Sequence, residues 1–257
     1  VAVGDSGRRN QVLEDPDGSI LYSGPLVVLT SRVTASAAEI LAGAVKDYRR
    51  GVVVGDDHTF GKGSVQTVAP LPPGLGALKL TTAMFFRPGG SSTQQTGVES
   101  DIVLPSLTQI PEFGEQYQPY SLPAREIDRF AVDREAGVNT AGGYAPVSAE
   151  TIARLREQSA QRIAASERFA EVRQEIAKQQ ENEGVVKVAE LMEKKTTDAG
   201  EEAGEPAPAV GDAAVIPPPA VAPESRRKKD DEPSAQLVEA LEILADLVLA
   251  SPQLALN

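Results

Sequence analysis

The sequence contains no cysteine, no tryptophan and a single histidine among its 257 residues. The missing cysteines exclude disulfide bonds, thiolate-bound metals and cysteine nucleophiles. A Ser-His-Asp triad could use only His58, which we interpret as a loop residue. No spacing of Asp, Glu and His residues suggests a metal site, so we expect neither a metal nor another cofactor.

Positive charge and long apolar runs are also scarce. The chain has 25 Lys and Arg against 37 Asp and Glu, a formal net charge of −12, and no basic stripe, so we expect no nucleic-acid binding. No run approaches the roughly 20 apolar residues of a membrane span. The chain begins with Val1 rather than methionine, so we interpret it as a fragment or a processed chain whose leader peptide cannot be judged.

The first part of the chain has the pattern of an α/β layer. Four short apolar runs, bounded by glycine, proline or polar residues, have the length of strands: residues 24–30, 51–55, 77–86 and 101–105. Between the first two runs, the segment "TASAAEILAGAVKDYRR" (residues 34–50) carries apolar residues at helical spacing. The order strand, helix, strand therefore favours an α/β fold class.

The second part is predicted to be helical, with one interruption. Residues from about 120 to 195 are expected to form helices, with a break in phase near Ser166, which can cap a second segment. Residues 196–233 are rich in Ala, Pro, Glu and Gly and predict a disordered linker without packed structure. A last amphipathic helix follows, and we expect it to dock through one apolar stripe formed by Leu237, Val238, Leu241, Leu244, Leu247 and Val248.

Two polar residues follow the first two predicted strands. Ser36 lies at the start of the predicted helix, where free N–H groups and the positive end of the helix dipole can stabilise an oxyanion. A serine nucleophile needs a base, and Lys62 is the candidate because burial beside apolar strands favours its neutral amine. Each residue also has a plainer interpretation: Ser36 and Glu39 fit a helix capping box, and Lys62 could be a solvated turn residue.

The stretch "TFGKGSVQ" (residues 59–66) can also be compared with a phosphate-binding loop, G-x-x-x-x-G-K-[ST]. The first glycine of that pattern would be Gly55, which lies one residue too far from the lysine. A further glycine separates Lys62 from Ser64, the hydroxyl residue that would hold magnesium. Both differences disfavour this alternative.

The segment "VTASAAEILAGAVKDYRRGVVVGDDHTFGKGSVQ" (residues 33–66) resembles the active-site segment of the carboxy-terminal-processing peptidases, in particular the tail-specific protease group. The segment "MFFRPGGSSTQQTGVESDIVLP" (residues 84–105) resembles the hairpin and G-V-x-x-D stretch that follow it, and residues from about 120 to 250 resemble the helical C-terminal domain of the long members. The resemblance implies the C-terminal part of a crotonase/ClpP-like serine protease core, followed by an α-helical domain.

The resemblance also implies roles for single residues. Ser36 would be the nucleophile of a Ser-Lys dyad, Lys62 its general base and Gln66 a residue that orients the base, and the backbone N–H of Ala37 would be one oxyanion donor. The implied substrates are proteins or peptides with apolar C-terminal tails, with a lipoprotein adaptor as a candidate partner. No cofactor is implied, and the long bacterial members work in the periplasm or cell envelope.

Two features differ from the family's usual pattern. The separation between Ser36 and Lys62 is 26 residues, and the additional residue lies in Asp56-Asp57-His58. The resemblance places a PDZ domain and the second oxyanion donor upstream of Val1, so we expect the chain as given to have little activity. We nevertheless expect Ser36 Oγ and Lys62 Nζ to approach within hydrogen-bonding distance.

These observations divide the chain into four parts: the C-terminal part of a catalytic domain (1–115), a helical domain (116–195), a linker (196–233) and a terminal helix docked on the helical domain (234–250). A non-catalytic scaffold derived from a protease, which binds partners through its helices, is the alternative function.

Overall fold

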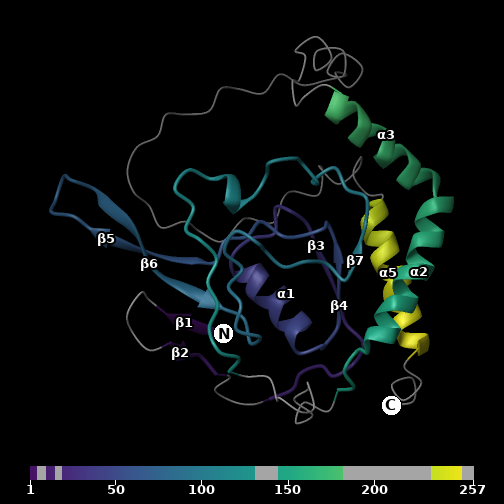
Figure 1. Ribbon diagram of the computed structural model, residues 1–257, viewed down its shortest axis with the longest axis horizontal. Helices are drawn as coiled ribbons and strands as arrows, with labels where there is room; N and C mark the ends of the chain where they lie inside the picture. Colours follow the sequence, from purple (N-terminus) through teal and green to yellow (C-terminus); the bar gives the residue numbers. More distant parts are fainter. Residues whose placement is uncertain (5–9, 15–18, 131–143, 182–232, 251–257) are drawn as a thin grey trace, which may run out of the picture. The chain divides into compact units, whose positions relative to one another are not determined.

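The computed structural model describes residues 1–4, 10–14, 19–130, 144–181 and 233–250. The chain divides into two compact units, residues 1–173 with 234–257, and residues 174–233. The first unit contains two β-sheets, and the helices of the second half follow these sheets in the sequence, so the architecture is mixed α/β (Figure 1).

One sheet is parallel and carries the predicted strand–helix–strand unit. Its strand order is β3 (Val27–Thr30), β4 (Val52–Gly55) and β7 (Ile102–Val103), and α1 (Ala37–Asp47) connects β3 to β4. The register places Val27 opposite Val52 and Thr30 opposite Gly55. The predicted strand–helix–strand order of the α/β layer is therefore confirmed. Because β3 and β4 are parallel, the turns that follow them lie at the same edge of the sheet.

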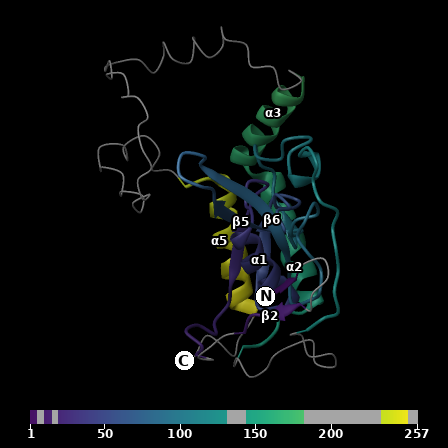
Figure 2. The same ribbon diagram turned by 90° about the vertical axis from the view of Figure 1, so that its left-hand side faces the viewer.

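The second sheet is antiparallel, with the order β2-β1-β6-β5. Its strands are β1 (Ala2–Gly4), β2 (Gln11–Val12), β5 (Ser64–Pro70) and β6 (Ala77–Phe86). The β5–β6 hairpin begins two residues after Lys62, and its pairing is interrupted by a bulge between Val65 and Gln66. Figures 1 and 2 both show this hairpin extending away from the parallel sheet.

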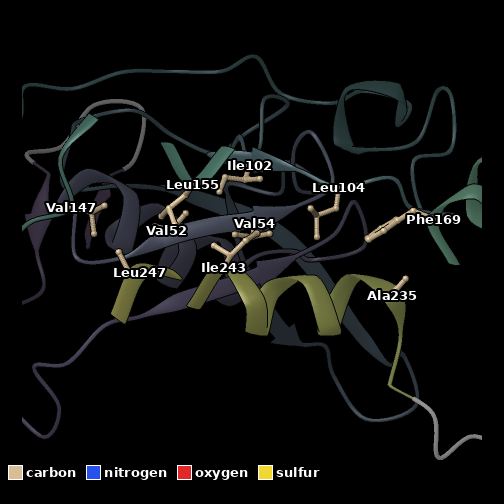
Figure 3. Packing of buried hydrophobic residues seen from close by; sticks show 10 residues of the cluster. All are labelled: Val52, Val54, Ile102, Leu104, Val147, Leu155, Phe169, Ala235, Ile243 and Leu247. Atoms are coloured by element: carbon tan, nitrogen blue, oxygen red, sulfur yellow. The ribbon is translucent and has the colours of Figure 1, made fainter. Parts of the chain in front are cut away.

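The main hydrophobic core lies between the parallel sheet and the later helices (Figure 3). Val52 and Val54 point into this core, and Val53 points to the opposite face of the sheet, because side chains alternate along a strand. Helix α1 packs against β4 as well. The core also includes Ile102, Leu104, Val147, Leu155 of α2 (Ala149–Ala165), Phe169 of α3 (Glu167–Glu181), and Ala235, Ile243 and Leu247 of α5 (Ala235–Ala250).

The predicted break between two helices is confirmed. Helix α2 ends at Ala165, and Ser166 leaves the helical conformation with a ψ of 122°. Its Oγ accepts a hydrogen bond from the N–H of Phe169 at 3.4 Å, so α3 starts again in a new phase. The predicted linker at 196–233 lies outside the described residues apart from Pro233, and no helix of the described part is long and apolar enough to cross a membrane.

The expectation of helical structure from about residue 120 to 195 is wrong for residues 121–130, because this segment runs extended, and residues 131–143 and 182–195 lie outside the described residues. The N–H of Ile127 donates to the carbonyl of Gly90, and the carbonyl of Arg125 accepts from the N–H of Ser92. Pairing with the turn after β6 thus replaces intrahelical hydrogen bonds. Two residues of the segment, Ile127 and Phe130, pack against a small core formed by Ala2, Met84 and Phe86.

Helix α5 packs against α2 and β3, but not through the whole stripe that we predicted. Leu237 and Leu241 are 42% and 55% exposed, although both belong to the predicted stripe. The helix contacts α2 and also β3, so it covers the sheet and not the helices alone. The buried face consists of Ala235, Glu239, Ala240, Ile243 and Leu247.

An ion-pair network joins the buried face of α5 to α2. Arg162 of α2 lies 2.8 Å from Glu239 and 2.7 Å from Asp246, joining the two helices. Glu239 is 4% exposed, and a buried carboxylate must be paired to be tolerated. The pair with Arg162 therefore allows Glu239 to lie on the buried face of α5 beside Ile243 and Leu247.

We predict that Ile243→Ala lowers the free energy of unfolding by about 2–5 kcal/mol, because Ile243 is fully buried between α5 and the sheet. The matched variant Leu241→Ala should change it by less than about 0.5 kcal/mol, as is usual for exposed positions. Urea unfolding of both variants measures the difference. Similar losses for the two residues would show that α5 buries the predicted stripe after all.

Candidate active site

Ser36 occupies a strained turn between β3 and α1. Its φ of 58° and ψ of −116° lie in a region that non-glycine residues rarely adopt. Such strain costs about 1–3 kcal/mol and concentrates at functional sites, including the strand-to-helix turns that carry nucleophilic serines. The N–H of Ala37, the first residue of α1, has no hydrogen-bond partner among the described residues, so it is free to bind an anion.

The carboxylate of Glu39 joins this turn to the loop that carries the lysine. Its Oε2 accepts hydrogen bonds from the N–H groups of Ser36 (2.7 Å) and Lys62 (2.9 Å). Its Oε1 accepts from the N–H of Gly61 (2.7 Å) and the hydroxyl of Thr59 (2.5 Å). The Glu39 side chain is fully buried. One carboxylate therefore fixes the backbones of both predicted catalytic residues.

Only one of the four hydrogen bonds of Glu39 follows from a local sequence pattern. The bond from Glu39 to the Ser36 N–H is the one that a capping box predicts. The other three donors lie 20 to 23 residues further along the chain, which no local pattern reveals. The feature of the sequence that could have indicated these partners is the negative charge of Glu39, because a glutamate close to a buried strand needs strong hydrogen-bond donors.

Burial raises the pKa of Glu39 above its ordinary value, and the four hydrogen bonds oppose this shift without cancelling it. A carboxyl group whose pKa is raised on folding binds more protons in the folded than in the unfolded state. Its contribution to stability is therefore greatest below its unfolded pKa, and is lost as pH rises through its folded pKa.

The glycines that flank the lysine are required by close packing against the segment 92–95. Gly61 has a φ of 95°, and a Cβ there would lie 2.9 Å from the carbonyl carbon of Gln95. A Cβ on Gly63 would lie 2.6 Å from the backbone nitrogen of Gln94. The buried side chain of Gln94 accepts a hydrogen bond from the Gly63 N–H at 2.9 Å. No local sequence pattern predicts this role for Gln94.

These contacts remove the physical basis of the phosphate-loop alternative. In a phosphate-binding loop, consecutive backbone N–H groups point at the phosphate oxygens. Here the N–H groups of Gly61 and Lys62 bind the Glu39 carboxylate, and that of Gly63 binds Gln94. The loop thus already surrounds an anionic group of the protein itself.

The side chains of the predicted dyad are not joined directly. Lys62 Nζ donates to the carbonyl oxygen of Ser64 at 3.0 Å and lies 3.4 Å from its Oγ. The described residues give Lys62 no hydrogen bond with Ser36 or with Gln66, and Gln66 is exposed beyond the β-bulge. The dyad therefore stays a prediction.

The loop with the additional residue is tied to the turn after β3. The Arg32 guanidinium binds Asp57 through two hydrogen bonds of 2.9 and 2.8 Å, and the Arg32 N–H donates to Asp56 at 2.7 Å. Burial raises the pKa of Asp57, but the hydrogen bond with Arg32 and the nearby positive charges outweigh burial, so its pKa is lowered. His58 directs Nδ1 to the backbone carbonyl of Thr59 at 2.7 Å. No cluster that could hold a metal ion occurs in the described residues.

We predict that Glu39→Ala lowers the free energy of unfolding by about 3 kcal/mol or more, because four donors lose their acceptor in a buried site. Glu39→Gln should cost about 1–3 kcal/mol, because one amide oxygen keeps part of the acceptor capacity. Glu99→Ala, at an exposed position, is the control. Urea unfolding at neutral pH measures the three variants, and a Glu39→Ala variant as stable as the control would contradict the assigned role.

We also predict a pH-dependent effect of Asp57→Asn. The wild-type advantage should be about 1 kcal/mol or less at neutral pH, because the Asp57 side chain is 45% exposed. Since its pKa is lowered, the advantage is complete above the ordinary value of 3.8 and disappears as pH falls through the folded value. Thermal melting of both proteins between neutral pH and acid tests this, and a difference that persisted in acid would refute it.

The sequence of this chain is similar to those of known proteins, which is evidence of common ancestry with them. Residues 2–104 match the sequence profile of peptidase family S41. The tail-specific protease of Haemophilus influenzae is 34% identical over 183 residues, which cover 68% of this chain and 25% of that protein. The carboxy-terminal-processing protease of Bartonella bacilliformis is 47% identical over 87 residues, which cover 34% of this chain and 20% of that protein.

A solved structure, the photosystem II D1 C-terminal processing protease, is 48% identical over the matched part. The match has a TM-score of 0.29 and covers 31% of this chain and 20% of that one. The chain thus spans about a quarter or less of the length of these relatives.

Proposed function

Because this chain belongs to peptidase family S41, as a homologue of the C-terminal processing and tail-specific proteases, we propose that its full-length form is a serine endopeptidase with Ser36 as nucleophile and Lys62 as general base. The observation that carries the proposal is the Glu39 carboxylate, which accepts hydrogen bonds from the backbone N–H groups of both residues. A shared acceptor keeps the serine turn and the lysine loop together whichever way the two side chains point.

The proposed reaction begins when the neutral amine of Lys62 takes the proton from Ser36 Oγ. Oγ attacks the carbonyl carbon of the scissile peptide bond, and the tetrahedral oxyanion accepts a hydrogen bond from the Ala37 N–H. The protonated amine then gives its proton to the departing amine nitrogen, leaving an acyl-enzyme. Lys62 activates a water in the same way to hydrolyse the ester.

Two features of the site bear on this sequence of steps. The free N–H of Ala37 lies at the N-terminus of α1, where the helix dipole favours negative charge. Ser64 accepts a hydrogen bond from the Lys62 amine at the start of β5, so in the proposed reaction the lysine side chain leaves this partner before Nζ meets Ser36. Gln66 has no contact here that assigns it a role, and its function in orienting the base remains part of the proposal.

We propose that the substrates are polypeptides with apolar C-terminal tails. The names of the relatives, tail-specific protease and carboxy-terminal-processing protease, support action at a C-terminal end, and the apolar character of the tail is the expectation of the resemblance described above. We further propose a bacterial periplasmic or cell-envelope location for the full-length protein. Both proposals rest on similarity to proteins of which this chain covers a minor part.

The test is cleavage of a peptide with an apolar C-terminus by the full-length protein. Ser36→Ala and Lys62→Met should each reduce kcat by at least about 10³-fold, because general-base catalysis and the nucleophile are both lost. Matched controls are Ser91→Ala and Lys79→Met, which change a serine and a lysine outside the site and should retain activity.

Cleavage that survives Lys62→Met would remove the lysine from the mechanism. Full-length protein that binds such peptides without cleaving them would favour the non-catalytic scaffold instead. Circular dichroism of each variant separates loss of chemistry from loss of folding.

A further inference from the structure

The loop that carries Lys62 is held by a segment from further along the chain, residues 113–115. The backbone N–H of Glu115 donates a hydrogen bond to the carbonyl oxygen of Phe60 at 2.8 Å. The ring of Phe113 meets the ring of Phe60 edge to face, with 5.5 Å between the ring centroids, which is a favourable arrangement for an aromatic pair. This segment therefore fixes the backbone two residues before the lysine.

The same segment reaches the other side of Lys62 through the side chain of Gln94. Gln94 is fully buried, and its side-chain oxygen accepts a hydrogen bond from the N–H of Gly63 at 2.9 Å. Its side-chain nitrogen donates to the carboxylate of Glu115 at 3.0 Å, with Ser121 Oγ as a more distant acceptor at 3.5 Å. Because a carboxylate can only accept, Glu115 turns the amide nitrogen toward itself and leaves the amide oxygen for Gly63.

The lysine loop needs such outside support. Gly61 and Gly63 have no side chains with which to pack, and glycine has more backbone freedom than any other residue, so contacts from other segments must select one conformation. The N–H of Lys62 binds Glu39, which fixes one side of the loop. Residues 113–115 fix the other side, directly and through the Gln94 amide.

The position of this loop determines where a base can act. A general base must lie within hydrogen-bonding distance of the proton that it takes, and a displacement of about 1 Å can reduce the rate by about 10²-fold. The Gln94 and Glu115 side chains touch the loop and not Ser36, so they can act on the reaction only through the position of Lys62.

Glu115 belongs to the segment that follows the catalytic region. It lies in a short 3₁₀ helix, Glu115–Tyr117, and outside residues 2–104, which match the family profile. The hydrogen bond between Gln94 and Glu115 therefore links the region shared with the family to the part of the chain that comes after it.

We propose that Gln94 and Glu115 are positioning residues for the general base Lys62, acting through the backbone of the lysine loop without touching the substrate. This inference rests on the proposed function, in which Lys62 takes the proton from Ser36. It adds that the segment after the catalytic region sets how well the base is placed.

The experiment exchanges the two ends of the hydrogen bond in the full-length protein and follows cleavage of a peptide with an apolar C-terminus. Gln94 Nε2 lies 3.0 Å from Glu115 Oε1, so Gln94→Glu brings two carboxylates into contact. We expect kcat to fall by about tenfold or more with KM nearly unchanged, because like charges repel and displace the loop that carries the base. The double variant Gln94→Glu with Glu115→Gln exchanges amide and carboxylate, and it should recover kcat to within about threefold of the wild type.

A second measurement follows the contact without turnover. Hydrogen exchange of the peptide that contains Gly63 should be faster in Gln94→Glu and should slow again in the double variant, because the Gly63 N–H loses and regains a fixed acceptor. Gln116→Glu, which adds the same charge at an exposed neighbouring position, is the control and should resemble the wild type in both measurements.

Urea unfolding establishes that each variant is folded under the assay conditions, so a loss of kcat reports on the site and not on folding. If Gln94→Glu does not fold, Glu115→Ala at its half-buried position replaces it, with the same expected loss of kcat. The inference is overturned if the folded variant keeps the wild-type kcat, if KM changes in place of kcat, or if the double variant recovers neither kcat nor slow exchange. Cleavage that survives Lys62→Met, or a wild-type protein that does not cleave, overturns the proposed function and the base-positioning role with it, and the exchange data then report the contact alone.

Discussion

The carboxylate of Glu39 accepts four hydrogen bonds from groups on two separate segments, and the candidate site keeps its shape only while those bonds hold. One segment carries Ser36 in a strained conformation, and the other carries Lys62 between two glycines. Burial disfavours the charged carboxyl group, as its raised pKa shows, so the site holds its geometry at some expense of stability near neutral pH. A loss of folding free energy in exchange for a fixed geometry is typical of functional sites.

The fold brings these two segments together for a simple geometric reason. In a parallel strand–helix–strand unit, the turns after both strands emerge at the same edge of the sheet, and ligands and catalytic groups gather there. The turn after β3 contains Ser36, and the loop after β4 contains Lys62. Arg32 and Asp57 add a second bridge between the same two turns, and Gln94 fixes the lysine loop from the other side.

The sequence predicted those parts of the structure that local patterns determine. Apolar runs identified the strands of the parallel sheet and the long β6 strand, helical spacing identified α1, and Ser166 marked the break between α2 and α3. Long-range contacts account for what it did not predict. The extended path of residues 121–130 depends on pairing with the turn after β6, and the buried face of α5 includes Glu239, which pairs with Arg162 of α2.

In the candidate site, too, local patterns were predictable and long-range contacts were not. Ser36 at a helix start and Lys62 after a buried strand could be selected from the sequence, whereas the central role of Glu39 appears only when donors 20 or more residues away are seen. Gln66 illustrates the opposite case, since the family resemblance implied a role for it that its exposed position after the bulge does not supply by itself.

The most direct test of the account is labelling of the full-length protein with a fluorophosphonate, followed by mass spectrometry of the modified peptide. The account predicts one adduct, on Ser36, whose rate of formation falls sharply in Lys62→Met and in Glu39→Gln while both variants remain folded. An adduct on a different serine, or labelling of Ser36 at an unchanged rate in both variants, would contradict the claim that a shared carboxylate brings a nucleophile and its base together.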